Sequence, residues 1–260
     1  MKQVMACGMA TLGLVAGMVP CARAQATTGK QVAERIYNRD EGADNVFAVR
    51  MTLVDRRGRE RQRTMTTYSK RLADGRINTF MQFDSPADIQ GTRFLTLEQK
   101  GEDDIQHLYL PALGRSRRIV GGQRRQSFVN TDFTFEDMER RHPDEDTHTL
   151  RGEEKYKDWD CYVVETVPGE GRDSQYSKVV VWMDKSSDTA VKIDFYDRRD
   201  RHVKQFRVDR LEKKDGFWTV MDSVMENLAR NTRTRLETLE VKYNQGLDDA
   251  MFTVRRLEEQ

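Results

Sequence analysis

Cysteine is scarce in this sequence, with 3 among 260 residues. Cys7 and Cys21 lie in an apolar N-terminal stretch, so Cys161 stands alone in the rest of the chain. A lone cysteine excludes an intramolecular disulfide in that part. Its setting, Cys161-Tyr162-Val163-Val164, is typical of a small buried residue on a strand, and no nearby base marks it as a nucleophile.

The short motifs of the common enzyme classes are also missing. The sequence contains no Gly-x-Ser-x-Gly, no Walker loop and no His-Glu-x-x-His. Its four histidines are scattered, and the segment His142–His148 has the composition of a polar surface loop, which is a poor framework for zinc. We therefore predict a protein that is not an enzyme and that uses no metal and no cofactor. A hydrolase with an unfamiliar site remains an alternative.

Charge of one sign is not in excess, because 44 Lys and Arg oppose 43 Asp and Glu. This balance gives no support for a nucleic-acid partner. Although 33% of the residues are charged, the apolar residues gather in alternating runs. Such runs are typical of sheets with one solvated face and not of disorder.

The N-terminal stretch has a composition of its own. Lys2 precedes an apolar run from Val4 to Val19, and Ala22-Arg23-Ala24 then gives a small-x-small pattern. The run is too short and too interrupted by glycine for a membrane span of about 20 apolar residues. These features predict a secretory signal peptide that is cleaved after Ala24.

This cleavage divides the chain into a signal peptide, residues 1–24, and one domain, residues 25–260, with a periplasmic location. A buried N-terminal helix is the alternative for the first segment. Cys21 leaves lipidation open, although the proline directly before it fits acylation poorly.

Alternating strands fill most of residues 25–260. Phe47, Val49, Met51 and Leu53 alternate with polar or small residues, and Asp74-Gly75 and Asp215-Gly216 are hairpin signals. About ten or eleven strands joined by short turns predict an antiparallel, mainly β protein with a few short helices. We expect a helix at 29–38, a loop with a short helix at 127–140, a helical turn at 247–251 and an edge strand at 252–257.

The stretch 109–138 is the most unusual part of the sequence. It holds five arginines within eleven positions, namely Arg115, Arg117, Arg118, Arg124 and Arg125. Arginine forks bind phosphate and carboxylate well, so these residues are candidates for an anionic headgroup site or for partner docking. An edge strand kept soluble by charge explains the same composition.

The same stretch resembles a known family. Tyr109-Leu110-Pro111-Ala112-Leu113 is followed by Arg117-Arg118-Ile119, a glycine-rich turn, Ser127-Phe128, Asp132-Phe133 and Glu136-Asp137. This order is similar to the LolA-like branch of the LolA/LolB superfamily of outer membrane lipoprotein-sorting proteins. The chain departs from it at Asn130, where relatives tend to have a glycine that reaches positive φ more easily.

The resemblance implies a half-open β-barrel, in which one curved antiparallel sheet wraps an apolar hollow plugged by short helices. It also implies a monomeric carrier that moves a lipid, or the acyl chains of a lipoprotein, from an inner-membrane donor to an outer-membrane acceptor. A periplasmic adaptor that binds a protein partner of an envelope complex, such as an RND-type exporter, and no lipid is the alternative.

Apolar residues on the strands and in the 127–140 segment are the candidates for the hollow and its plug. They are Met51, Leu53, Met81, Phe83, Leu95, Phe128, Phe133, Phe135, Met138, Val181, Met183, Phe206 and Trp218. Alternation indicates which residues share a face of a strand, but it does not distinguish a packed face from a hollow one.

Overall fold

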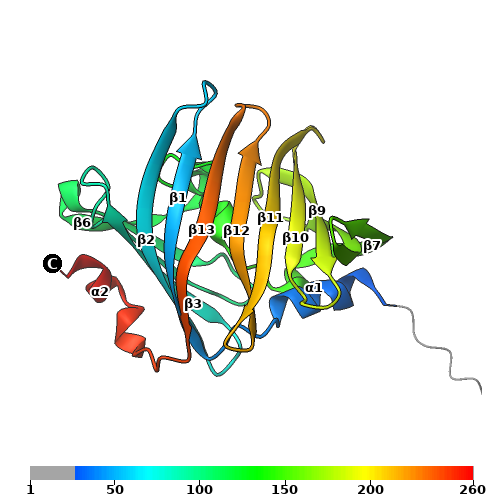
Figure 1. Cartoon of the computed structure of the whole chain (residues 1–260), viewed down its shortest axis with the longest axis horizontal. Helices are drawn as coiled ribbons and strands as arrows, with labels where there is room; N and C mark the ends of the chain where they lie inside the picture. Colours follow the sequence, from blue (N-terminus) through cyan, green and yellow to red (C-terminus); the bar gives the residue numbers. More distant parts are fainter. Residues whose placement is uncertain (1–26, 260) are drawn as a thin grey trace, which may run out of the picture.

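One antiparallel sheet of thirteen strands forms the body of the protein (Figure 1). The computed structural model describes residues 27–259, so the expected signal peptide and Cys21 lie outside the described residues. The strands are β1 (Asp44–Val54), β2 (Glu60–Arg71), β3 (Ile77–Ser85), β4 (Arg93–Leu97), β5 (Ile105–Leu110), β6 (Arg115–Ile119), β7 (Asp146–Tyr156), β8 (Trp159–Pro168), β9 (Tyr176–Asp184), β10 (Ala190–Asp197), β11 (His202–Lys214), β12 (Phe217–Asn227) and β13 (Thr232–Tyr243).

The strand order is β6-β5-β4-β3-β2-β1-β13-β12-β11-β10-β9-β8-β7. Strands that are consecutive in the chain are therefore neighbours in the sheet, except for β6 and β7, which lie at its two edges. In the middle, the first strand, β1, pairs with the last, β13. The two edge strands, β6 and β7, do not meet, so the curved sheet is not closed into a barrel. The predicted mainly β, half-open architecture is confirmed.

Tight turns join most strands where the sequence predicts them. Asp215 and Gly216 both have positive φ, at 51° and 89°, and link β11 to β12. Positive φ at both central residues matches the twist of a two-residue hairpin. Gly75, with φ of 88°, lies in the turn between β2 and β3.

Strand β7 is absent from the sequence prediction, which places a polar loop over its first residues. It is an edge strand in which exposed charged residues such as Arg151 and Glu153 alternate with half-buried ones. Charged residues keep such an edge from pairing with other chains. They also remove the apolar alternation on which a prediction depends.

The two α-helices pack at opposite ends of the sheet (Figure 1). Helix α1 (Gly29–Tyr37) begins with a capping box between Thr28 and Gln31, and Val32 packs on β8 and β9. Helix α2 (Val254–Glu258) replaces the edge strand predicted at 252–257. Thr253 caps its first turn, while Phe252 and Leu257 are buried against the sheet, which a helical spacing allows.

Five short 3₁₀ helices complete the fold. They are η1 (Pro111–Leu113), η2 (Gly121–Arg125), η3 (Glu136–Met138), η4 (Pro143–Glu145) and η5 (Asp249–Met251). The last confirms the helical turn expected at 247–251, and η3 confirms the short helix expected within 127–140. Within residues 27–259, no helix is both long and apolar enough to cross a membrane.

Residues 120–145 connect the two edge strands, so the chain must pass across one face of the sheet. Figure 1 shows this green segment behind the central strands. We call the face that it covers the inner face, and we call residues 126–139 the plug. Helix α2 packs on the opposite, outer face.

Candidate functional site

The inner face and the plug share the largest apolar cluster of the described chain. Strands from β1 to β12 contribute to it, and three plug phenylalanines complete it. Its buried members are Val49, Met51, Met65, Phe83, Ile89, Phe94, Leu108, Ile119, Phe128, Phe133, Phe135, Tyr176, Phe195 and Met225.

Plug aromatics fill the space over β3 and β4. The Phe128 ring lies 5.0 Å from the Phe94 ring and 5.6 Å from the Phe135 ring, and Phe128 and Phe135 are each 1% exposed. Aromatic pairs at these distances add to the stability gained from burial alone. The plug thus occupies the place where the resemblance implies that acyl chains bind.

Nine of the thirteen apolar candidates lie in or against this cluster. They are Met51, Leu53, Met81, Phe83, Phe128, Phe133, Phe135, Met138 and Phe206. Leu95 does not line this space, because its side chain points to the outer face and packs with Leu257 of α2. Met183 packs beneath Val32 of α1, Val181 lies on β9 outside the buried cluster, and Trp218 lies at the start of β12 beneath Lys213.

A buried ionic group fixes the C-terminal half of the plug. The Asp137 carboxylate accepts hydrogen bonds from the Tyr176 hydroxyl at 2.7 Å and from the Lys204 ammonium. Both charged side chains are almost fully buried. Burial, with the nearby Asp137 charge, raises the pKa of Tyr176, which therefore stays a neutral donor.

The tip of the plug is held by hydroxyls and by one arginine. The Asp132 carboxylate accepts hydrogen bonds from the hydroxyls of Thr232 and Thr234 on β13. Arg63 Nη1 donates to the Val129 carbonyl at 2.6 Å. Val129 and Asn130 have φ of 41° and 63°, so the tip keeps the left-handed backbone for which glycine is the usual residue.

Glu136 and Glu139 add further buried contacts. Glu136 accepts from the Ser174 hydroxyl at 2.5 Å and from Arg141 at 2.6 Å. Glu139 pairs with Arg124, whose Nε lies 2.6 Å from Oε1. Because buried charges are stable only with partners, these contacts define one position for the plug on the sheet.

The five arginines of the 115–125 segment divide into two groups. Arg115, Arg117 and Arg118 are exposed on edge strand β6, and none has a carboxylate within 4.0 Å in the part of the chain that is described. Arg124 is 4% exposed and ion-paired, so it is not available for docking. Arg125 pairs with Asp173 at the surface.

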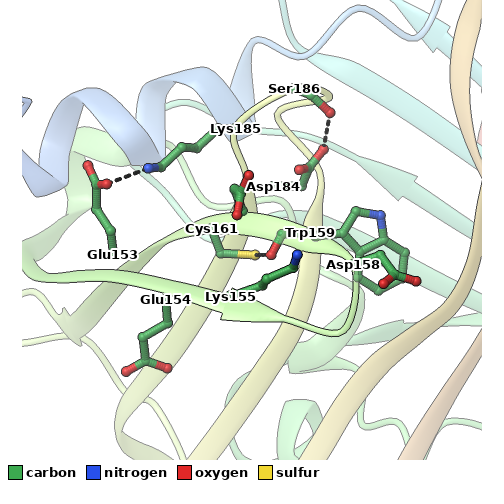
Figure 2. Close-up of a pocket in the computed structure, with 10 residues that line it drawn as sticks. Glu153, Glu154, Lys155, Asp158, Trp159, Cys161, Asp184, Lys185 and Ser186 are labelled. Carbon is green, nitrogen blue, oxygen red and sulfur yellow. Dashed lines mark hydrogen bonds and ion pairs between the residues drawn. The ribbon is translucent and has the colours of Figure 1, made fainter.

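A cleft of about 570 Å³ lies at the hairpin between β7 and β8, far from the plug in sequence (Figure 2). Its side chains are mostly charged, and Lys185 pairs with Glu153 at 2.5 Å. The Cys161 thiol at its floor donates to the Trp159 carbonyl, and burial raises the pKa of this thiol to about 11. Cys161 is therefore a buried, protonated strand residue at neutral pH, as the sequence predicts.

In the segment His142–His148, the ring of His148 is held by two hydrogen bonds within the protein. His148 bonds Thr166 through Nδ1 and the Pro143 carbonyl through Nε2, each at 2.9 Å. Among residues 27–259, no three His, Cys, Asp or Glu side chains are placed to hold one metal ion.

Sequence reasoning does not find the polar partners of the plug. Lys204, Tyr176 and Thr234 follow their partners in the plug by 39 residues or more, and nothing around them in the sequence sets them apart. Asp132 and Asp137 stand out only through the resemblance, which includes Asp132-Phe133 and Glu136-Asp137.

Known structures share this arrangement over nearly their whole length. A crystal structure of a DUF1329 family protein from Desulfovibrio piger is 34% identical, covers 88% of this chain and 97% of its own, and superposes with a TM-score of 0.83. The chain belongs to the DUF1329 family. A family whose members are described as uncharacterized proteins also matches residues 75–259.

Other solved structures connect the DUF1329 fold with the LolA-like proteins. A proposed outer membrane lipoprotein-sorting protein domain from Vibrio parahaemolyticus is 28% identical, with a TM-score of 0.84 and coverage of 89% of this chain and 98% of its own. A LolA superfamily protein from Nitrosomonas europaea shares the fold at 22% identity, covers 88% and 98%, and has a TM-score of 0.67. The predicted resemblance is confirmed. No curated protein matches the chain.

Proposed function

We propose that this protein is a non-catalytic periplasmic carrier that binds a lipid, or the acyl chains of a lipoprotein, against the inner face of its sheet. One observation supports this most directly. A plug of phenylalanines, on a connection without α-helix or long strand, covers the apolar inner face and stands where an apolar cargo would lie. The similarity to the Vibrio lipoprotein-sorting domain points the same way.

Burial of acyl chains supplies the binding energy in this proposal. Each buried methylene contributes about 0.8 kcal/mol, so one chain suffices for tight binding once the plug moves. The apolar candidates Met51, Leu53, Met81, Phe83 and Phe206 would then form the wall. An inner-membrane donor and an outer-membrane acceptor would load and unload a monomeric carrier, because the aqueous periplasm offers the cargo no other apolar surface.

Native mass spectrometry of protein purified from cells, followed by organic extraction, tests the proposal. We expect reproducible co-purified lipid. A protein that is consistently free of lipid, and that takes up none from detergent-solubilised lipid, would overturn the carrier.

Phe133→Asp tests the role of the plug. We expect lipid occupancy to change, because a carboxylate placed at this buried position disfavours the closed plug and the apolar cargo alike. Leu239→Asp is the matched control, because Leu239 is 45% exposed on β13. Equal lipid occupancy in both variants would contradict a plug that shares its place with cargo.

A second candidate rests on Arg115, Arg117 and Arg118. These three arginines are exposed on an edge strand and have no carboxylate partner among residues 27–259, so they fit a docking surface for an acidic envelope protein. In this alternative the plug stays closed and the protein is an adaptor. A photo-crosslinking residue in place of Arg117 should then capture one envelope protein in cells, whereas the same residue at Arg199 should capture none.

A further inference from the structure

A second cleft, of about 510 Å³, opens at the tip of the plug. The turn between β1 and β2, the turn between β12 and β13, and the plug tip form its walls. Five arginines line it, namely Arg59, Arg61, Arg63, Arg230 and Arg233. Leu53 lines the same cleft and also packs against the inner-face cluster, so the cleft borders the place proposed for the cargo.

Positive charge exceeds negative charge in this cleft. Of its acids, Asp55 is paired with Arg59 at 2.6 Å, and Asp132 already accepts hydrogen bonds from Thr232 and Thr234. Glu60 is the third acid. The side chains of Arg61, Arg230 and Arg233 are exposed, and none has a carboxylate within 4.0 Å among residues 27–259.

Arg63 is the unusual member of the set. It is only 8% exposed, and its one hydrogen bond among the described residues is the bond from Nη1 to the Val129 carbonyl. Burial lowers its pKa, and the charge of Asp88 offsets this effect only in part. A buried guanidinium without a carboxylate partner is costly, and its remaining N–H groups suit an oxyanion.

We propose that this cleft binds a phosphate-type oxyanion, with Arg63 at its floor and Arg61 and Arg230 at its rim. One arginine guanidinium can donate to two phosphate oxygens at once. A headgroup without a phosphate offers no such pair of oxygens. If the proposed carrier function holds, the anion is the headgroup phosphate of a lipid, and Leu53 directs the acyl chains onto the inner face. If it fails, the ligand is free phosphate or a small phosphate ester.

Isothermal titration calorimetry of the full chain tests this proposal with three probes. These are inorganic phosphate, dihexanoyl-phosphatidylglycerol below its micelle concentration, and dihexanoylglycerol, a lipid with the same acyl chains and no phosphate. The doubly substituted Arg61→Gln, Arg230→Gln protein removes two exposed guanidiniums without touching the core. The matched control, Arg199→Gln, Arg255→Gln, removes two exposed arginines that lie outside the cleft.

We expect phosphate and the anionic lipid to compete for one site, and the cleft variant to bind each about tenfold more weakly than the control. Phosphate binding without competition by the lipid would keep the site and identify free phosphate as its ligand. Equal binding by the cleft variant and the control, or no binding of either anion, would overturn the site. Equal binding of both lipids without phosphate binding would overturn the site and leave the carrier intact.

Discussion

Asp137 shows how single residues fix the plug. Removing its carboxylate, as in Asp137→Ala, leaves the Lys204 ammonium buried without a counter-ion. Breaking one side of a buried pair is expected to lower the free energy of unfolding by about 3–5 kcal/mol. Urea denaturation followed by circular dichroism measures this loss. Glu240→Ala, which breaks the exposed pair with Lys242, should leave the denaturation midpoint nearly unchanged; an equal effect of both substitutions would contradict the anchoring role.

Asp104 makes stability depend on pH near neutrality. Its carboxylate accepts backbone hydrogen bonds from Gln99 and Arg140, at 3.0 and 3.2 Å, and burial raises its pKa to about 7. The folded protein therefore holds a proton that the unfolded chain releases around its ordinary pKa of 3.8. As pH rises from there to about 7, this group lowers the free energy of unfolding.

Asp104→Asn removes this dependence, because the amide does not titrate. The wild type loses stability between pH 5 and pH 8 through this group, and the variant does not. We therefore expect the free energy of unfolding of the variant, minus that of the wild type, to increase over this range. Urea denaturation at both pH values measures the change. A difference between the two proteins that is the same at both values would show that the Asp104 pKa is not raised.

At the level of elements, local patterns predict the hairpins and fail at the ends of the sheet. Asp74-Gly75 and Asp215-Gly216 announce their turns because positive φ restricts the residues that fit there. Strand β7 escapes prediction because its solvated, charged edge carries no apolar alternation. Phe252 and Val254 alternate with Thr253 and Arg255 as in a strand, but the buried Leu257 breaks the alternation and, three residues after Val254, lies on the same face of helix α2.

Helix α2 covers both the outer face and the free edge of β6. Leu257 is fully buried, and Glu258 accepts hydrogen bonds from the Ser116 backbone N–H and hydroxyl. Leu257→Ala should lower the unfolding free energy by about 2–5 kcal/mol and speed hydrogen exchange at the Ser116 amide. Denaturation and NMR-detected exchange measure the two effects. Arg256→Ala, at an exposed position of the same helix, should change neither the unfolding free energy nor the exchange rate. Unchanged exchange in Leu257→Ala would show that α2 does not protect the edge of β6.

For the whole molecule, the proposed carrier function gives the two faces of the sheet separate tasks. Met51 and Leu95 are almost equally buried, but Met51 lies on the inner face and Leu95 on the outer face. Either change to alanine should destabilise the protein by about 2–5 kcal/mol. Only Met51→Ala should also alter lipid occupancy in native mass spectra. A similar change in occupancy for Leu95→Ala would mean that the stability of the protein, and not the inner face, determines how much lipid it carries.

The sequence predicts some residues of the candidate site, and there is a physical reason why it does not predict the others. Phe128, Phe133 and Phe135 stand out as aromatics in a polar segment, and the structure places all three in one cluster. The sequence groups Leu95 with the inner-face residues, because alternation does not tell which face of a strand a distant helix will cover. The cleft arginines come from two hairpins, β1–β2 and β12–β13, that are distant in the sequence, so only the pairing of β1 with β13 brings them together.

The pairing of β1 with β13 also governs how the chain can mature. As the chain is synthesised, strands β1 to β6 can pair one after another. The other neighbour of β1 is β13, which is the last strand to appear. Until then β1 presents an unprotected row of backbone groups, open to another chain. Joining the halves is thus a late, long-range step that is intrinsically slow. A chaperone that shields β1 during synthesis would act at the most vulnerable point of assembly.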